Sequence, residues 1–380
     1  MSRLNPSATA QDPVPVLGIA ATPWRYESDA VLDELVFDAT STALREAGVR
    51  KQDVGLSVTA SLDLYDGRSI SSGLTNAASG GYLAQSYRVE GDLGQAIIAA
   101  AQAIAAGDAE VALAVGIYNP EVSEADPSAR RRFLQQIANH GFEPHADRPV
   151  GLTADVVLAL HAGLAVDSGV LTEQQLAEIA AEEITRGAAR PGSARPAAVT
   201  AEEVLASERI SDPLRELMLP AETTGAVAVV LGSLARARRA LAPRAVLTGW
   251  GQASSDTTAG GQWLTDPAAA TRRAALEAYR RAGLSDPAQQ IGAAELTAAT
   301  PALLAPTLEA LDLAKSLPAG AVEPSGGVRS AYPGVANGGL RLLETVRWLE
   351  ARGGRAVSHS ADLLTGTVTN TATVLVVEEV

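Results

Sequence analysis

The chain has 380 residues, of which 47% are hydrophobic, so it is long enough to form two core-forming halves of a globular protein. Its formal net charge of -14 argues against nucleic acid as a partner, because a phosphate backbone requires a basic face. Cysteine is absent, which excludes disulfides, thiolate metal ligands and a cysteine nucleophile, and the four histidines lack metal-ligand spacing.

The start of the chain carries no targeting signal that we recognise. Residues 1–13 are polar and contain proline, which predicts a short disordered leader rather than an apolar signal core. No run of 18 apolar residues follows it. We therefore expect a cytoplasmic protein that does not enter a membrane.

The first part of the chain predicts alternating strands and helices. Strands are expected at 14–21 and 54–60, with a helix at 31–47 between them that Gly48 ends. Residues 61–85 are rich in Ser, Gly, Asp and Asn, which predicts a long loop.

Residues 86–116 form the stretch on which the functional argument depends. The spacing of its apolar residues predicts a loop, a helix that begins just after Glu90 and ends at Gly107, and a buried strand at 111–115. Because the helix is nearly all Ala, Ile, Leu and Gln, we expect it to be buried on most sides. Its free N–H groups and positive dipole end then point at Glu90 and Gly91.

The next segment, residues 117–221, has a looser pattern that proline interrupts repeatedly. We interpret it as an excursion that is inserted before a buried strand at 225–231. It predicts helices at 129–139, 153–167 and 173–186, the last with Thr172 as N-cap, and a capping box over Thr200–Glu203.

The second half begins with a strand at 245–251 and a helix at 267–282, and it repeats features of the first half. Thr42–Val49 is similar to Glu277–Leu284, and Gln95–Gly116 matches Leu340–Ser360. Two matches in the same order predict a duplicated βαβαβ unit with a mostly parallel sheet covered by helices. The amino ends of the repeated helices, near Glu90 and near Asn337–Gly339, should then approach the same cleft.

Six further motifs stand out, at Phe37–Gly48, Gln95–Ile97, Ala106–Val111, Glu202–Leu214, Pro324–Gly327 and Tyr332–Gly339. Together they resemble the thiolase superfamily, and most of all its sterol-carrier-protein-2-type and lipid-transfer branch. This resemblance implies an α/β fold of duplicated βαβαβ halves in αβαβα layers with an inserted loop domain. It divides the chain into a leader (1–13), an N-terminal half (14–116 plus 222–243), the loop domain (117–221) and a C-terminal half (244–380).

The chain departs from the family at each expected catalytic position. Counting back from Gln95 places Glu90 where the family has its cysteine nucleophile, and Tyr332 stands where the family has the histidine of its Gly-His-Pro motif. Thr297 occupies the position of the sterol-carrier-type histidine, and the second cysteine falls at Gly366, within Leu364–Val368. A covalent acyl-transfer cycle therefore lacks both its nucleophile and its base.

The replacements leave two candidate catalytic side chains. Glu90 is either a general base or simply the cap of its helix. Tyr332 is either an acid/base, as in the steroid side-chain aldolases of the superfamily, or a packed ring whose hydroxyl bonds the backbone. The N–H groups of Glu90 and of the Leu364–Val368 loop remain available for an oxyanion hole.

The resemblance also implies a ligand. Arg130, Arg131, Arg132 and Arg148 lie in the segment that binds coenzyme A phosphates in the family, although solvated arginines explain each of them equally well. We expect no tightly bound cofactor and no metal, with a coenzyme A thioester as substrate or ligand.

Two functions from different classes follow. The first is a thiolase-fold enzyme that acts on acyl-CoA or carrier-bound thioesters by making or breaking C–C bonds without a cysteine. The second is a catalytically inactive partner subunit of an active thiolase or ketosynthase, or of a small acyl-CoA-binding zinc-ribbon/OB protein. Either function implies a homodimer or heterodimer formed through the thiolase fold.

Overall fold

The computed structural model describes residues 12–24, 30–63, 71–81, 84–119, 132, 133, 135, 136, 139, 142–190, 193–239, 242–255, 262–362 and 371–380. Its central feature is a mixed sheet of nine strands within that part of the chain. In sheet order the strands are β3 (Gln85–Val89), β2 (Leu56–Ala60), β4 (Val111–Tyr118), β7 (Gly225–Gly232), β1 (Val14–Ala21), β8 (Ala245–Ser254), β11 (Thr371–Glu378), β10 (Arg355–Ala361) and β9 (Ala293–Glu295).

The strand pairings confirm the duplication that the sequence predicts. In the first half β1 and β4 each run antiparallel to β7, and β2 runs parallel to β4. The second half repeats this scheme, since β8 and β10 run antiparallel to β11, and β9 runs parallel to β10. Antiparallel pairing of β1 with β8, from Val14–Leu247 to Val16–Ala245, joins the two halves.

The prediction of a mostly parallel sheet is wrong, because the last strand of each half runs antiparallel to its neighbours. A parallel crossover needs about a dozen residues or more. In the second half only residues 362–370 separate β10 from β11, which is too few for such a crossover. In the first half the long segment between β4 and β7 also returns the chain antiparallel. The apolar spacing of the sequence predicts that helices alternate with strands. It does not indicate whether the next strand pairs parallel or antiparallel to its neighbour.

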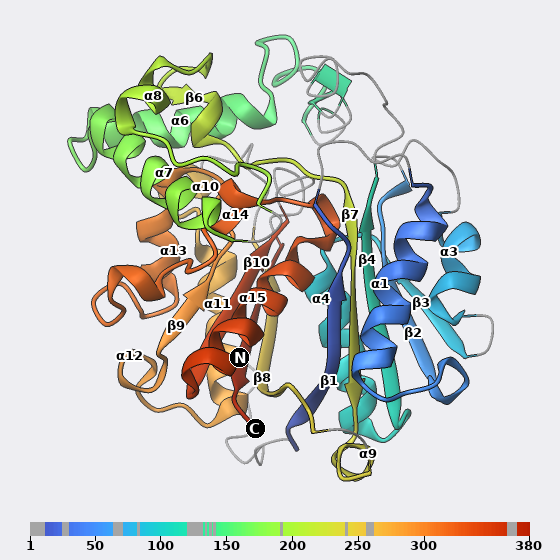
Figure 1. Cartoon of the computed structure of the whole chain (residues 1–380). Coiled ribbons are helices and arrows are strands. Elements are labelled where there is room, and N and C mark those ends of the chain that lie inside the picture. The colour runs from blue at the N-terminus through green and yellow to red at the C-terminus, as the bar shows by residue number, and fades with distance from the viewer. Residues whose placement is uncertain are drawn as a thin grey trace, which may run out of the picture.

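The helices lie in three layers with the strands between them (Figure 1). α1 (Leu32–Glu46) and α3 (Ser71–Ser79) cover the outer face of the first half, and α11 (Ala269–Ala282) and α13 (Leu304–Ala310) cover that of the second. α4 (Leu93–Ala106) and α15 (Asn337–Arg352) are central, and their apolar residues share one core with strands of both halves.

The predicted elements agree well with those observed, with two exceptions before Glu90. α3 and β3 form where the sequence predicts only loop. Neither has a strong apolar pattern: α3 is SSGLTNAAS, and β3 is mainly exposed. β4 also continues to Tyr118, beyond the expected strand at 111–115.

The segment between β4 and β7 gathers at one end of the sheet (Figure 1). Its elements are α6 (Ala154–Asp167), α7 (Glu173–Ala188), α8 (Ala201–Ala206), β5 (Arg209–Ser211), β6 (Leu214–Arg215) and the 3-10 helix η4 (Glu216–Met218). They share a small core of their own. The N-cap at Thr172 and the capping box at Thr200 are confirmed, while most of the helix predicted at 129–139 lies outside the described residues.

Short elements complete the fold. They are α9 (Leu234–Ala237), α10 (Gln262–Thr265), α12 (Pro287–Gln290), α14 (Gly327–Ser330), and the 3-10 helices η1 (Lys51–Asp53), η6 (Pro301–Leu303), η7 (Ala319–Ala321) and η8 (Gly334–Ala336). Among the described helices, none is both long and apolar enough to span a bilayer.

Candidate functional site

The amino ends of α4 and α15 meet at one buried carboxylate, as the internal repeat predicts. Asp92 is the N-cap of α4, and its Oδ1 accepts a 2.8 Å hydrogen bond from the Gly94 N–H. Its Oδ2 accepts a 3.0 Å bond from the N–H of Gly338 in the first turn of α15. We refer to Asp92–Gly94 and Asn337–Gly338 as the paired helix ends.

Glycine is required at both ends for this approach. A Cβ at Gly338 would lie 2.1 Å from Asp92 Oδ1 and 2.5 Å from the Gly94 backbone nitrogen. A Cβ at Gly94 would lie 2.3 Å from Thr373 Oγ1. A side chain at Gly338 would therefore separate the two central helices, and a side chain at Gly94 would push α4 away from β10 and β11.

The carboxylate of Asp92 is 4% exposed and has a further partner on the second half of the sheet. The Ser360 hydroxyl donates to its Oδ1 at 2.6 Å, and Ser360 itself lies 2.6 Å from Thr373 Oγ1. Burial raises the pKa of Asp92 to about 7, although the hydrogen bonds from Ser360, Gly94 and Gly338 favour the ionised form. A carboxyl group with this pKa exchanges its proton near neutral pH.

Tyr332 lies just before η8, which leads directly into α15. Its N–H donates to the Ala221 carbonyl at 2.7 Å, and its carbonyl accepts from the Thr223 N–H at 3.0 Å. The side chain is buried in a small apolar cluster with Tyr118. These contacts fix the ring beside the end of β4.

The phenol of Tyr332 is held in its protonated form. Burial raises its pKa well above the usual value of 10, and the negative charges of Asp362 and Asp92 raise it further. Tyr118 and Glu222 act in the same direction. At neutral pH the group is therefore a proton donor and not a phenolate base.

Thr297 joins the same region through hydrogen bonds. Its hydroxyl donates to the His359 carbonyl at 3.2 Å and accepts from the Asn337 side-chain amide at 2.8 Å. Because Asn337 begins α15, these bonds bring Thr297 to the paired helix ends.

Glu90 is not the cap of α4. That role belongs to Asp92, two positions later, because Asp92 is the residue that turns inward at the start of the helix. The Glu90 side chain is 71% exposed and lies 3.4 Å from Arg88, which also pairs with Asp63 at 2.7 Å. The structure thus separates Glu90 from the buried cluster around Asp92.

The remaining candidates are only partly within the described structure. Gly366, Arg130 and Arg131 lie outside the described residues. Arg132 and Arg148 are exposed, and the Arg148 Nε donates to the Phe142 carbonyl at 3.0 Å.

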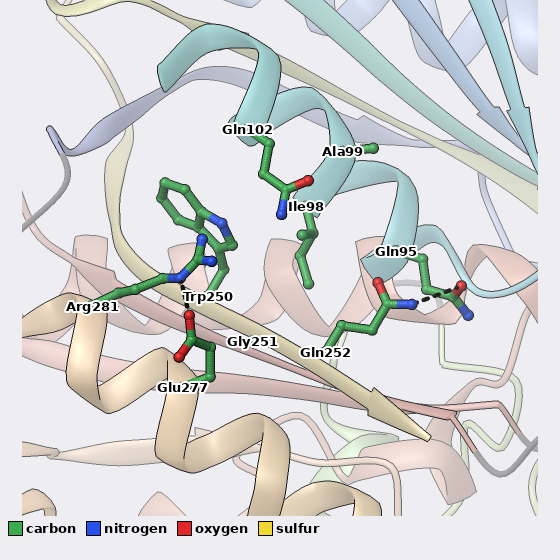
Figure 2. Close-up of a pocket in the computed structure, with 9 residues that line it drawn as sticks. All are labelled: Gln95, Ile98, Ala99, Gln102, Trp250, Gly251, Gln252, Glu277 and Arg281. Atoms are coloured by element: carbon green, nitrogen blue, oxygen red, sulfur yellow. Dashed lines mark hydrogen bonds and ion pairs between the residues drawn. The ribbon is translucent and has the colours of Figure 1, made fainter. Parts of the chain in front are cut away.

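A separate pocket of about 180 Å³ lies on the face of α4 that is turned toward β8 and α11 (Figure 2). Gln252 donates to Gln95 at 3.3 Å across it, and the Arg281 guanidinium lies 5.2 Å from the Trp250 ring centroid. The residues that line it are Gln95, Ile98, Ala99, Gln102, Trp250, Gly251, Gln252, Glu277 and Arg281. Neither Asp92–Gly94 nor Asn337–Gly338 is among these lining residues, so the pocket is distinct from the paired helix ends.

Sequence reasoning missed Asp92, Ser360 and Asp362. Asp92 carried a usable signal, because an aspartate directly before an apolar helix is a preferred N-cap. Ser360 and Asp362 carry no such signal, because a Ser and an Asp at the end of a strand are common. Only the tertiary fold places them beside Asp92 and Tyr332.

Comparison with solved structures identifies the fold. Similar chains include a protein described as an Ltp2-ChsH2(DUF35) aldolase, with 22% identity, a TM-score of 0.76 and coverage of 98% of this chain and 99% of that one. Human mitochondrial 3-ketoacyl-CoA thiolase has 17% identity and a TM-score of 0.75 over 98% of this chain and 100% of its own. A structure of the same human enzyme in complex with CoA has 16% identity and a TM-score of 0.73 over 97% of this chain and 98% of its own.

The chain therefore has the thiolase fold over nearly its whole length. No protein-family model matches the chain, and no curated protein is significantly similar to it in sequence.

Proposed function

We propose that this protein acts on an acyl-CoA or carrier-bound acyl thioester and breaks or forms a C–C bond without a covalent acyl-enzyme. The observation that carries the proposal is the buried, protonated Tyr332 beside Asp92 and Asp362, in a chain that contains no cysteine. A similar solved structure is described as an aldolase, which supports this reaction class.

The reaction that suits such a donor is a retro-aldol cleavage of a β-hydroxyacyl thioester. A base removes the β-hydroxyl proton, the bond between the α and β carbons breaks, and a carbonyl product leaves. The bonding electrons remain on the thioester as an enolate, which takes a proton at its α carbon. Tyr332 supplies that proton, and the reverse sequence is the aldol addition. Glu90 is the candidate base only if its side chain, which lies in solvent beside Arg88, turns toward the bound substrate.

Arg132 and Arg148, together with Arg130 and Arg131, are the candidate ligands of the coenzyme A phosphates. Both described arginines are exposed, as a site for a large anionic ligand requires. A similar solved structure contains CoA, which is consistent with a nucleotide thioester as ligand.

A second function has one observation in its favour. The N–H groups of Gly94 and Gly338 already donate to Asp92, so these helix-end donors are not free for a substrate oxyanion. This favours an inactive partner subunit in a homodimer, or in a heterodimer with an active thiolase or ketosynthase, or one that docks a zinc-ribbon/OB protein.

The test is turnover of β-hydroxyacyl-CoA mixtures, followed by mass spectrometry of the thioester products. Tyr332→Phe keeps the ring and removes the donor, so we expect turnover to fall roughly a hundredfold or more. Glu90→Gln should also reduce it. Tyr87→Phe is the matched control, because Tyr87 is 55% exposed on β3, and its turnover should equal that of the unmodified protein.

Equal turnover in Tyr332→Phe and the unmodified protein would remove Tyr332 from the mechanism. If no thioester is converted, and native mass spectrometry after co-expression with a candidate partner shows a stable heteromer, the inactive-subunit function replaces the enzymatic one.

A further inference from the structure

We infer that a groove between α1 and α3 is a docking site for a short basic, amphipathic segment of a partner protein. The two helices lie side by side on the outer face of the first half, away from the paired helix ends (Figure 1). The groove has a volume of about 340 Å³. α1 contributes Asp33, Glu34, Phe37 and Asp38 to its lining, and α3 contributes Leu74 and two alanines. We refer to it as the α1–α3 groove.

The apolar side chains of the α1–α3 groove are exposed. Phe37 is 53% exposed and Leu74 is 55% exposed, although both line the same hollow. Val31, directly before α1, is 52% exposed and extends the apolar surface. Exposed apolar residues that gather on neighbouring elements mark an interaction site, whereas single scattered ones do not. A bulky apolar side chain of a partner therefore fits between Phe37 and Leu74.

The internal repeat shows that the fold does not require an aromatic residue at this position. α11 covers the outer face of the second half as α1 covers that of the first. When the alignment of Thr42 with Glu277 is continued back along the two helices, Arg272 stands opposite Phe37. Arg272 pairs with Asp266 at 2.8 Å, so the equivalent surface of α11 is polar and compensates its charge within the chain. The exposed ring of Phe37 is thus a property of α1 alone.

The rim of the groove carries negative charge that the chain does not neutralise. Asp33 and Glu34 lie in the first turn of α1, where the helix dipole favours acidic residues, and Glu34 accepts from the Val31 N–H at 3.1 Å. Asp38 lies beyond that turn and four residues after Glu34, a spacing at which like charges repel. Within the part of the chain that the structure describes, neither Asp33 nor Asp38 forms an ion pair. A cation on the partner would remove this repulsion.

These two properties define the chemistry of the partner. An apolar side chain of the partner enters the groove, and Lys or Arg on either side of it face Asp33 and Asp38. An amphipathic helix presents apolar and basic residues at this spacing, and helices commonly bind in grooves of this kind. The acidic rim repels a phosphate backbone and an anionic lipid surface, so the occupant is a protein segment.

The experiment measures binding of a defined probe to the full chain. The probe is a short synthetic helical peptide with Leu and Phe on one face, flanked by Lys and Arg, and its binding is followed by fluorescence anisotropy. In Phe37→Ser we expect the affinity to fall roughly tenfold or more, because burial of an aromatic ring is lost. Leu74→Ser removes the opposite wall and should act in the same direction. Leu276→Ser is the matched control, since Leu276 is 66% exposed on α11, and it should leave the affinity unchanged.

The charged rim has a test of its own. Asp38→Asn should weaken binding roughly two- to fivefold at low salt, and the difference should disappear at high salt, because exposed charges are screened. Glu202→Gln is the control, since Glu202 is exposed in the first turn of α8, and it should have no effect.

Equal affinities of Phe37→Ser and Leu276→Ser for the peptide would overturn the inference, because the attraction would then be general and not located in the groove. Equal binding of a scrambled peptide of the same composition would overturn it as well. If sedimentation shows that the unmodified chain self-associates and Phe37→Ser does not, the occupant is a second copy of this chain instead of a partner protein. None of these measurements requires turnover, so they decide the inference independently of the proposed function.

Discussion

His359 is a buried side chain whose hydrogen bonds determine its protonation state. The Thr297 N–H donates to its Nδ1 at 3.3 Å, so Nδ1 carries no proton. The proton of the neutral ring is then on Nε2, which lies 3.0 Å from the Thr271 hydroxyl and donates to it. Burial lowers the pKa of His359 from 6.5 to about 3. The ring is thus a neutral link between α11 and β10 and not an acid/base at neutral pH.

This neutral state predicts a pH dependence that His359→Gln should remove. Glutamine offers the same acceptor and donor but does not titrate. Because the folded pKa lies below the unfolded one, the unfolded chain binds a proton first, and stability is lost as pH falls below about 6.5. Between pH 6.5 and 5.5 the unmodified protein should lose roughly 1 kcal/mol of unfolding free energy relative to the variant. Denaturant unfolding at both pH values measures this loss. If the unfolding free energy of the two proteins changed by the same amount between the two pH values, His359 would not be neutral in the folded protein.

The site residues show what a single sequence resolves at the scale of one residue. Glu90 and Asp92 are both acidic and both precede the apolar helix. Counting back from Gln95 in the family motif selects Glu90 as the residue at the nucleophile position. Only the turn before α4 decides which of them faces inward, and burial of Asp92 places Glu90 in solvent. Tyr332 is a candidate that a local motif indicates, whereas Ser360 reaches Asp92 only through the tertiary fold.

At the scale of elements, one buried ion pair joins the segment between β4 and β7 to the second half. Arg329 of α14 pairs with Glu183 of α7, and both side chains are almost fully buried. The guanidinium also donates to the carbonyls of Met218 at 3.3 Å and Ala298 at 3.1 Å. Burial lowers the pKa of Arg329 to about 9, because the charged guanidinium is removed from water.

Removal of one partner should therefore be costly. Glu183→Gln leaves a buried guanidinium without its counter-charge, and we expect a loss of about 3 kcal/mol or more in unfolding free energy. Glu182→Gln is the matched control on the same helix, since Glu182 is 70% exposed and lies 3.8 Å from Arg186. It should change stability by less than about 0.5 kcal/mol. Equal effects in the two variants would show that α7 is not anchored through Arg329.

The elements themselves were largely predictable, because most of them carry a strong local pattern. α4 has a nearly continuous apolar face and Gly107 as its stop, and α7 has a capping box at Thr172. α3 and β3 lack such patterns, since tertiary contacts and not local periodicity determine them. Strand direction has no local signature either, which is why the antiparallel β11 was not expected.

At the scale of the whole molecule, the two halves are joined in several places. β1 pairs with β8 in the middle of the sheet. Arg244, just before β8, pairs with Glu46 of α1 at 3.0 Å and with Glu350 of α15 at 2.7 Å. The paired helix ends make the central contact. Because these connections link α1, α4, α15 and both groups of strands, we expect the halves to unfold together.

The close approach at Gly338 provides the sharpest test of that coupling. In Gly338→Ala the new methyl group meets the Gly94 backbone at 2.5 Å as well as Asp92, and backbone atoms cannot move aside cheaply. We expect a loss of about 1–3 kcal/mol, measured by denaturant unfolding with calorimetry to follow the number of transitions.

Gly163→Ala is the matched control, because this helical glycine of α6 has only the Pro213 Cδ nearby, at 3.9 Å. It should gain about 0.4–1 kcal/mol, since alanine restricts the unfolded chain and favours helix. If Gly338→Ala were as stable as Gly163→Ala, the two central helices would not be in contact at Asp92. If it instead split one unfolding transition into two, the paired helix ends would be the main link between the halves, with β1–β8 pairing too short to hold them together alone.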